Sequence, residues 1–390
     1  MQVGIIESFF LIFAGAAVLA TIALFTRQPL LVAYMAVGAL LGPHGFAWIP
    51  NAEFVSDIGH IGIIFLLFLV GLDLPPAKLR NMLGESILTA LASTAIFFAL
   101  GFALLWSFGF GWIECLVAGI ACVFSSTIIG IKMLPTTVLH HRHVGEIVIS
   151  LLLIQDLIAI IALLALAGFG ADHGNSVPGH PLMVVAAFPV IAAGAFLGVK
   201  FIVTPLLSRF DAFNEFIFLL VIGWCLAIAT VSHLAGMSLE VGAIIAGVSL
   251  ASSPIAQFVT DNLRPLRDFF LILFFFSVGA AIDPAVLTKV IWPALCLGGA
   301  MLAVKPPVFR WLLAWQGESR DTSWEIGCRL GQASEFSLLV TTVALSGALV
   351  DGEAAHVIQG ATVLTLMAST YLVIFRYPSP IAISNKLRRD

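Results

Sequence analysis

Long apolar stretches constrain this chain more than any other feature of its sequence. A helix needs about 20 apolar residues to cross a bilayer, and 60% of the 390 residues are hydrophobic while only 10% are charged. That balance excludes an ordinary soluble domain. We predict an all-helical integral membrane protein whose main partner is the lipid bilayer. The thirteen predicted spans are 4–25, 29–48, 54–72, 84–108, 112–133, 144–169, 182–204, 213–233, 238–252, 262–281, 286–313, 323–347 and 354–376.

The basic residues between these spans predict the orientation of the chain. Arg27, Arg142 and Arg320 are among those that follow odd-numbered spans, whereas Lys289 is the one basic residue that follows an even-numbered span. Since cytoplasmic loops carry the excess of Lys and Arg, we expect an N-terminus outside a bacterial inner membrane and a basic cytoplasmic tail at 377–390. The net charge of −4 is spread thinly, so no nucleic-acid partner is predicted.

Two parts of the sequence resemble each other at a fixed offset. The stretch around Gly71 is similar to the one around Gly279, 208 residues later, and that offset corresponds to seven spans. Because seven is odd, the second copy enters the membrane from the opposite side, an architecture typical of secondary transporters. We therefore predict an inverted 6+6 repeat, with a first repeat at 1–181, a connector helix at 182–204 and a second repeat at 205–376. Further pairs at that offset, within a residue or so, are Gly38 with Gly247 and Ser126 with Ser334.

Three charged residues stand out near the middle of predicted spans, where insertion of each costs about 2.5–3.5 kcal/mol. Asp156 follows the polar Gln155 in the sixth span, and we predict that it binds an ion rather than forming a structural pair. For Lys305 two roles remain open, neutralising Asp156 or capping interrupted backbone. Glu335 is expected to be structural and to support Arg329.

A run of three hydroxyl residues, Ser125, Ser126 and Thr127, lies in the middle of the fifth span. An unwound segment there would expose carbonyls and hydroxyls that can replace part of the water shell of a cation. The repeat then predicts a matching interruption at Gly331 to Ser334. The alternative is that these hydroxyls bond within an intact helix.

Other polar features are weaker. The segment from His140 to His143 contains three histidines and one arginine in a predicted cytoplasmic loop. A solvated loop is the preferred interpretation, with pH sensing as the alternative, because histidine titrates near neutrality. The five cysteines lie in apolar runs without metal-ligand spacing, so neither a disulfide nor a zinc site is expected, and no cofactor is predicted.

Seven stretches together resemble the membrane domain of the monovalent cation:proton antiporter-2 family, and especially its Kef-type potassium/proton members. They are IGIIFLLFLVGLDL, SSTIIGIKML, LLLIQDLIAI, LEVGAIIAGVSLASSP, FFFSVGAAIDPAVL, AVKPPVFRWLL and RLGQASEFSLLV, in order along nearly the whole chain. The resemblance implies a dimer with the sodium/proton-antiporter fold and its crossed, broken helices. By the same resemblance Asp156 matches the ion-binding aspartate, Lys305 the core lysine, and residues 125–127 the first unwound segment.

Two comparisons with that family refine the prediction. Electrogenic sodium exchangers carry two adjacent acids where this chain has Gln155 and Asp156, which favours potassium and electroneutral exchange here. Kef-type chains usually continue into a cytoplasmic nucleotide-binding domain, whereas this sequence stops at Asp390, so either a regulatory domain is missing or this member is ungated.

The resulting prediction is a secondary active transporter that exchanges K⁺ for H⁺ at Asp156, with Gln155 and residues 125–127 as ligands. A monovalent cation, K⁺ or Na⁺, and H⁺ are its substrates, Ser334 and Arg329 are supporting residues, and Na⁺/H⁺ exchange is the first alternative. A gated potassium efflux channel and a sodium-coupled organic-anion symporter are alternatives of other classes. An enzyme is not expected, because the spans contain neither a paired catalytic acid motif nor a Ser-His arrangement.

Overall fold

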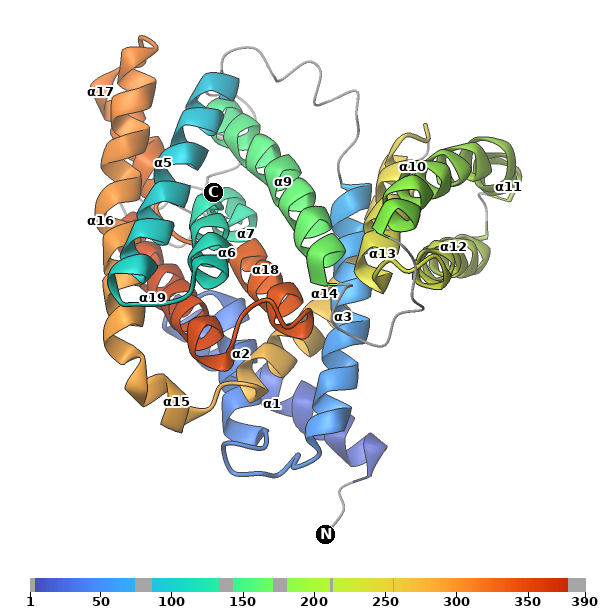
Figure 1. The fold of residues 1–390 in the computed structure, drawn as a ribbon, viewed down its shortest axis with the longest axis horizontal. Coiled ribbons are helices and arrows are strands. Elements are labelled where there is room, and N and C mark those ends of the chain that lie inside the picture. The colour runs from blue at the N-terminus through green and yellow to red at the C-terminus, as the bar shows by residue number, and fades with distance from the viewer. Residues whose placement is uncertain are drawn as a thin grey trace.

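The described part of the chain is entirely helical in the computed structural model (Figure 1). The structure describes residues 4–73, 86–132, 143–170, 181–210, 213–254 and 256–377. The predicted tail, apart from Tyr377, and residues 140–142 lie outside these ranges.

Helices occupy each of the thirteen predicted ranges, and three of those ranges, 112–133, 286–313 and 323–347, hold two helices separated by a break. Within the described residues, eight helices are long and apolar enough to cross a membrane, and four shorter apolar helices accompany them. The helices, in chain order, are α1 (Ile5–Phe25), α2 (Leu30–Leu41), α3 (Ala52–Leu72), α5 (Ser86–Ser107), α6 (Trp112–Val123), α7 (Thr127–Lys132), α9 (His143–Gly170), α10 (Pro181–Gly198), the π-helix η1 (Val199–Val203), α11 (Thr204–Arg209), α12 (Asn214–Leu234), α13 (Leu239–Ala251), α14 (Ala256–Ala280), α15 (Pro284–Lys289), α16 (Ile291–Trp315), α17 (Arg320–Arg329), α18 (Glu335–Ser346) and α19 (Gly352–Arg376).

Two predicted ranges differ from the observed elements in ways that the sequence did not indicate. The predicted connector helix at 182–204 runs on through Arg209, with the π-helix η1 in its second half. The range 286–313 divides at Val290 into α15 and α16. Pro306 and Pro307 lie inside α16 and lack a backbone N–H, so they free carbonyl acceptors one turn earlier, while α16 continues through both prolines as one helix. The proposed boundaries of the two repeats stay predictions.

Burial separates central helices from peripheral ones. The apolar part of α3 is 72% buried, whereas the corresponding part of α1 is only 22% buried. Figure 1 shows α10, α11 and α12 at one end of the longest axis, opposite α16 and α17. Large apolar side chains on α1 and α12, such as Phe10 and Leu219, remain exposed, as expected where lipid takes the place of water.

Glycines bring two pairs of helices into backbone contact. A Cβ atom on Gly38 in α2 would lie 2.0 Å from the carbonyl oxygen of Phe276 in α14, and one on Gly247 in α13 would lie 2.1 Å from that of Phe68 in α3. Gly38 and Gly247 are a pair that the sequence repeat relates, and so are α3 and α14. The two close contacts therefore have the relationship that an inverted repeat requires, and small residues allow it.

Candidate functional site

Two helices are interrupted where the sequence predicted it. The first interruption lies between Val123, the last residue of α6, and Thr127, the first of α7. The second lies between Arg329, which ends α17, and Glu335, which begins α18. Each new helix starts after a serine. Serine is favoured at helix N-termini because its hydroxyl oxygen accepts hydrogen bonds from backbone N–H groups that have no partner within the helix.

Ser126 and Ser334 occupy this capping position at the two interruptions. The hydroxyl oxygen of Ser126 accepts a hydrogen bond from the backbone N–H of Ile129 at 3.2 Å, and that of Ser334 accepts from Phe336 at 3.2 Å. Both serines are completely buried. Ser126 and Ser334 therefore restart helices in the protein interior, and the hydroxyl oxygen of each accepts from a backbone N–H.

The two interruptions lie directly against each other. Ser125 donates its hydroxyl hydrogen to the carbonyl oxygen of Leu330 at 2.8 Å, and Ser337 donates to the carbonyl oxygen of Ala121 at 2.6 Å. Both hydroxyls thus satisfy carbonyls that lack a helical partner at the end of a helix. The contacts make one connected centre from segments about 200 residues apart.

Lys305 joins the same two segments from α16. Its side chain is completely buried, and its Nζ donates to the carbonyl oxygen of Phe124 at 2.7 Å and to that of Gln332 at 3.0 Å. These carbonyls follow the C-terminal ends of α6 and α17, where the helix dipoles concentrate negative charge. Among the described contacts Lys305 forms no ion pair with Asp156. Of the two roles left open by the sequence, the structure shows the capping of interrupted backbone.

Asp156 lies in α9 beside the first interruption. The Thr127 hydroxyl donates to its Oδ1 at 3.3 Å and lies 3.5 Å from Oδ2, and the aspartate keeps partial exposure. Gln155 is buried, and its Oε1 accepts the backbone N–H of Ser125 at 3.0 Å. Gln155 therefore supports the unwound backbone, while the Asp156 carboxylate accepts from the Thr127 hydroxyl beside it.

Glu335 and Arg329 stand on either side of the second interruption. Ser334 donates its hydroxyl hydrogen to Oε2 of Glu335 at 3.3 Å. Arg329 is 1% exposed, and its Nη2 lies 2.7 Å from Oε1 of Glu325. The sequence analysis singled out Glu335 as a support for Arg329 and missed Glu325, which stands one helical turn before the arginine at a favourable spacing for an ion pair.

A hydroxyl-bearing face of α19 also supports the second interruption, and the sequence analysis missed it. The backbone N–H of Ala333 donates to the hydroxyl of Thr365 at 3.0 Å, and the hydroxyl of Ser369 donates to Oε1 of Gln332 at 2.9 Å. Both hydroxyl residues are buried. Their spacing of four residues places them on one helix face, a signal that the sequence did contain.

The chemistry available at this centre is that of hard oxygen ligands. A carboxylate and a hydroxyl suit cations such as sodium and potassium better than they suit soft metals. Within the described ranges, no group of three or more His, Cys, Asp or Glu side chains could hold a metal ion. The site therefore fits a weakly held monovalent ion or a proton.

Comparison with known proteins agrees with this chemistry. Residues 11–375 match the family described as sodium/hydrogen exchanger, transmembrane. The chain is 27% identical to the iron transporter MagA of Paramagnetospirillum magneticum, over 88% of this chain and 79% of that protein. It is also 27% identical to the putative K(+) efflux antiporter KefB of Alkalimonas amylolytica, over 88% of this chain and 52% of the relative, and 26% identical to K(+) efflux antiporter 6 of Arabidopsis thaliana, over 91% and 60%.

A solved structure shares the fold. The sodium proton antiporter MjNhaP1 of Methanocaldococcus jannaschii superposes with a TM-score of 0.66 at 17% identity, over 94% of this chain and 95% of that one. The chain spans little more than half the length of the two potassium efflux antiporters, so their whole activity does not transfer directly. The family match covers nearly the entire sequence, and the chain is a multi-pass membrane protein of the sodium/hydrogen exchanger family, a family of cation/proton antiporters and not of enzymes.

Proposed function

We propose that the protein exchanges potassium for protons, one for one, and that Asp156 binds the two ions in turn. The observation that carries the proposal is the position of the Asp156 carboxylate, 3.3 Å from the hydroxyl of Thr127 at the restart of an interrupted helix. A carboxylate beside unwound backbone can strip part of a cation's water shell and can equally accept a proton. Since one carboxylate cannot do both at once, the two ions compete, and competition coupled to alternating access yields exchange.

The contacts of Lys305 support electroneutral transport. Its Nζ is committed to the carbonyl oxygens of Phe124 and Gln332. A lysine held in this way has no need to gain or lose a proton when a cation arrives at Asp156. One positive charge then moves in each direction per cycle, and an imposed membrane potential should leave the exchange rate unchanged.

Two observations support potassium over sodium. Two of the relatives carry potassium efflux in their names, and Gln155 stands where electrogenic sodium exchangers have a second acid. Gln155 is neutral and bonded to the backbone of Ser125, so position 155 adds no second negative charge beside Asp156. A weaker electrostatic field at the site favours potassium, the larger ion, because removing its water shell costs less free energy than removing that of sodium.

The direct test uses purified protein in liposomes that contain a pH-sensitive dye. An outward potassium gradient should drive proton uptake in the wild type, and Asp156→Asn should lower the rate at least about a hundredfold, as expected for loss of the ion-binding charge. The matched control is Asp57→Asn, because Asp57 is an exposed aspartate in α3 that the proposal does not use. Full-rate exchange by Asp156→Asn would remove the aspartate from the mechanism.

The same assay separates the alternatives. Potassium, sodium, rubidium and lithium are supplied in turn, and we expect potassium and rubidium to support the fastest exchange. Ferrous iron is added as a further arm because of the relative named as an iron transporter. Cation flux without obligatory proton movement would identify a channel, and proton-independent, sodium-driven uptake of organic anions would identify a symporter.

We further propose that two copies associate in a bacterial inner membrane, with the N-terminus outside. Exposed apolar side chains on α1 and α10, including Phe10 and Val190, offer a surface that a second copy or lipid can cover. Cross-linking of the purified protein in liposomes tests the association, and cysteine accessibility at the two chain ends tests the orientation.

A further inference from the structure

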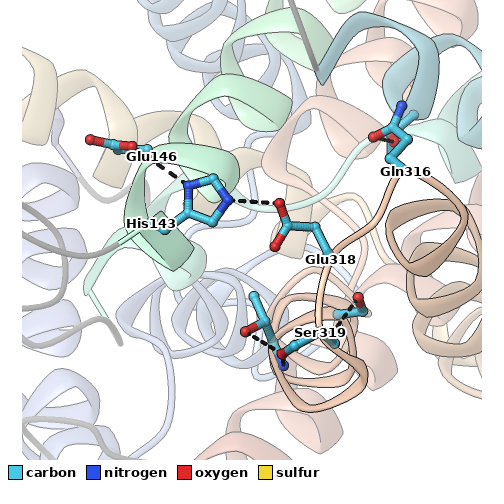
Figure 2. Close-up of polar contacts among 8 residues, drawn as sticks. His143, Glu146, Gln316, Glu318 and Ser319 are labelled. Carbon is cyan, nitrogen blue, oxygen red and sulfur yellow. Dashed lines mark hydrogen bonds and ion pairs between the residues drawn. The ribbon is translucent and has the colours of Figure 1, made fainter.

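One end of the bundle is held together by the short segment that connects α16 to α17. Figure 2 shows this segment, Gln316 to Ser319, between the ends of two other helices. The hydroxyl of Thr89 in α5 donates to Oε1 of Gln316 at 2.8 Å. Nε2 of His143, the first residue of α9, lies 2.7 Å from Oε1 of Glu318. The charge distribution of the sequence assigns this end to the cytoplasm.

His143 sits between two carboxylates at the surface. Since a carboxylate can only accept, the Nε2 hydrogen points to Glu318, while Nδ1 lies 3.8 Å from Oε2 of Glu146. The side chain of His143 is 57% exposed and that of Glu318 is 21% exposed. The imidazole can therefore exchange protons with water while its partner is largely enclosed.

Few other charges face this histidine within the described residues. The first turn of α5, Ser86 to Thr89, brings no titratable side chain, and the first turn of α17 brings Arg320 and Asp321, whose charges offset each other. Residues 133–142 lie outside the described ranges. Protonation of His143 thus adds one positive charge opposite two carboxylates, which strengthens the contact.

The contact joins the parts that build the exchange site. α9 carries Asp156 thirteen residues after His143, about 20 Å along the helix. α16 carries Lys305 thirteen residues before Glu318, and α17 ends at the second interruption. The His143–Glu318 contact therefore holds α9, which carries Asp156, against the segment that connects α16 to α17. α16 carries Lys305, and α17 leads into the second interruption.

We propose that His143 and Glu318 are positioning residues for transport, and that protonation of His143 on the side it faces strengthens their contact and speeds exchange. The inference rests on the proposed function. It requires the imidazole to act through helix position, because His143 lies too far along α9 to touch the ion. Alkaline solution removes the charge, weakens the contact and lets the end of α9 move against the connection.

The test measures cation-driven exchange at equal pH on both sides of the liposome, in steps from pH 5.5 to 8.5. His143→Lys keeps a positive charge at every pH in this range, so the part of the step near neutrality that depends on His143 should disappear and the alkaline rate should rise. The pH dependence that comes from competition at Asp156 is common to all variants. His143→Gln is neutral throughout and should hold the lower, alkaline rate. The expected difference is about threefold, the size that an exposed ion pair can supply.

Two further variants complete the design. Glu318→Gln removes the partner charge and should also flatten the step at the lower rate, which keeps the test decisive if a substitution at position 143 prevents folding. His60→Gln is the matched control, because His60 is also a partly exposed histidine, 46% exposed and 4.0 Å from Glu240, but it joins α3 to α13, away from the site. It should keep the wild-type profile.

The outcomes separate the inference from the proposed function. A wild type that exchanges potassium for protons, together with a His143→Lys variant that keeps the full step near neutrality, overturns the role of His143 and leaves the exchange function in place. A wild type without exchange overturns the proposed function itself. Equal loss of rate in His143→Lys and His143→Gln, with the step unchanged, reveals a purely structural role and also overturns the inference.

Discussion

The hydroxyl of Ser125 lies 2.8 Å from the carbonyl oxygen of Leu330, and this bond joins residues 205 positions apart in the chain. Each residue belongs to a different interrupted helix. Because Leu330 follows the last residue of α17, its carbonyl has no further helical turn to bond to. The bond therefore links the interruption between α6 and α7 to the interruption between α17 and α18, and it holds the two segments against each other.

Ser125→Ala should lower the free energy of unfolding by about 2 kcal/mol, since it leaves a buried carbonyl without its donor. Thermal unfolding in detergent measures the change. The control is Ser107→Ala, because Ser107 is exposed and bonds only within its own helix, to Leu104. Equal melting temperatures for the two variants would contradict the role of Ser125.

Lys305→Met should destabilise the protein by about 3 kcal/mol, because two buried carbonyls lose a charged donor. The same measurement applies, and exchange should fall with it. Lys305→Arg should restore part of the stability, as a guanidinium also donates to both carbonyls. If Lys305→Met unfolds at the wild-type temperature, the two bonds do not hold the interrupted segments.

Gly279→Ala should be costly, since a Cβ atom there would lie 2.0 Å from the carbonyl oxygen of Met35 in α2. Overpacking of this kind costs about 1–3 kcal/mol or forces the helices apart. Gly299→Ala in α16 is the control, because a Cβ atom there meets nothing within 4 Å and alanine favours helix. A melting point that falls for Gly299→Ala but not for Gly279→Ala would refute the close packing of α2 on α14.

Thr127→Val should raise the cation concentration needed for half-maximal exchange about fivefold, because it removes the hydroxyl beside Asp156 while keeping the shape of the side chain. One neutral hydrogen bond is worth about 1 kcal/mol, which corresponds to that factor. Thr127→Ser retains the hydroxyl and should remain near wild type. The prediction is wrong if valine and serine give the same half-saturation.

The sequence predicted the positions of the helices well, because the cost of exposed backbone in lipid imposes long apolar helices. Composition alone does not predict the start of α14. The first half of this helix, from Ala256 to Arg267, is more polar than the second, so only the second half has the composition of a membrane span. Pro306 and Pro307 lie within α16, and the helix continues through both. A proline frees acceptors four residues earlier, and the surrounding protein can tolerate this inside a packed bundle.

The residues of the candidate site were predictable, but most of their contacts were not. Ser125, Ser126 and Thr127 form an uninterrupted hydroxyl run, and the structure gives each a different partner: the carbonyl of Leu330, the N–H of Ile129 and the carboxylate of Asp156. Distant pairs such as Lys305 with Gln332 depend on how helices pack, which local patterns do not encode. The hydroxyl face of α19 went unnoticed because its partners, Gln332 and Ala333, lie in the interruption between α17 and α18, more than 30 residues earlier in the chain.

Lys305 recognises main-chain oxygens and not side chains. Substitution at Phe124 or Gln332 leaves a carbonyl in place, whichever amino acid is introduced, so these two positions can vary during evolution without removing the acceptors of the lysine. Position 305 has no such freedom. A change at position 305 therefore removes both bonds at once, whereas a change at Phe124 or Gln332 costs that residue's own buried contacts, such as the Gln332–Ser369 hydrogen bond, and keeps the acceptor of the lysine.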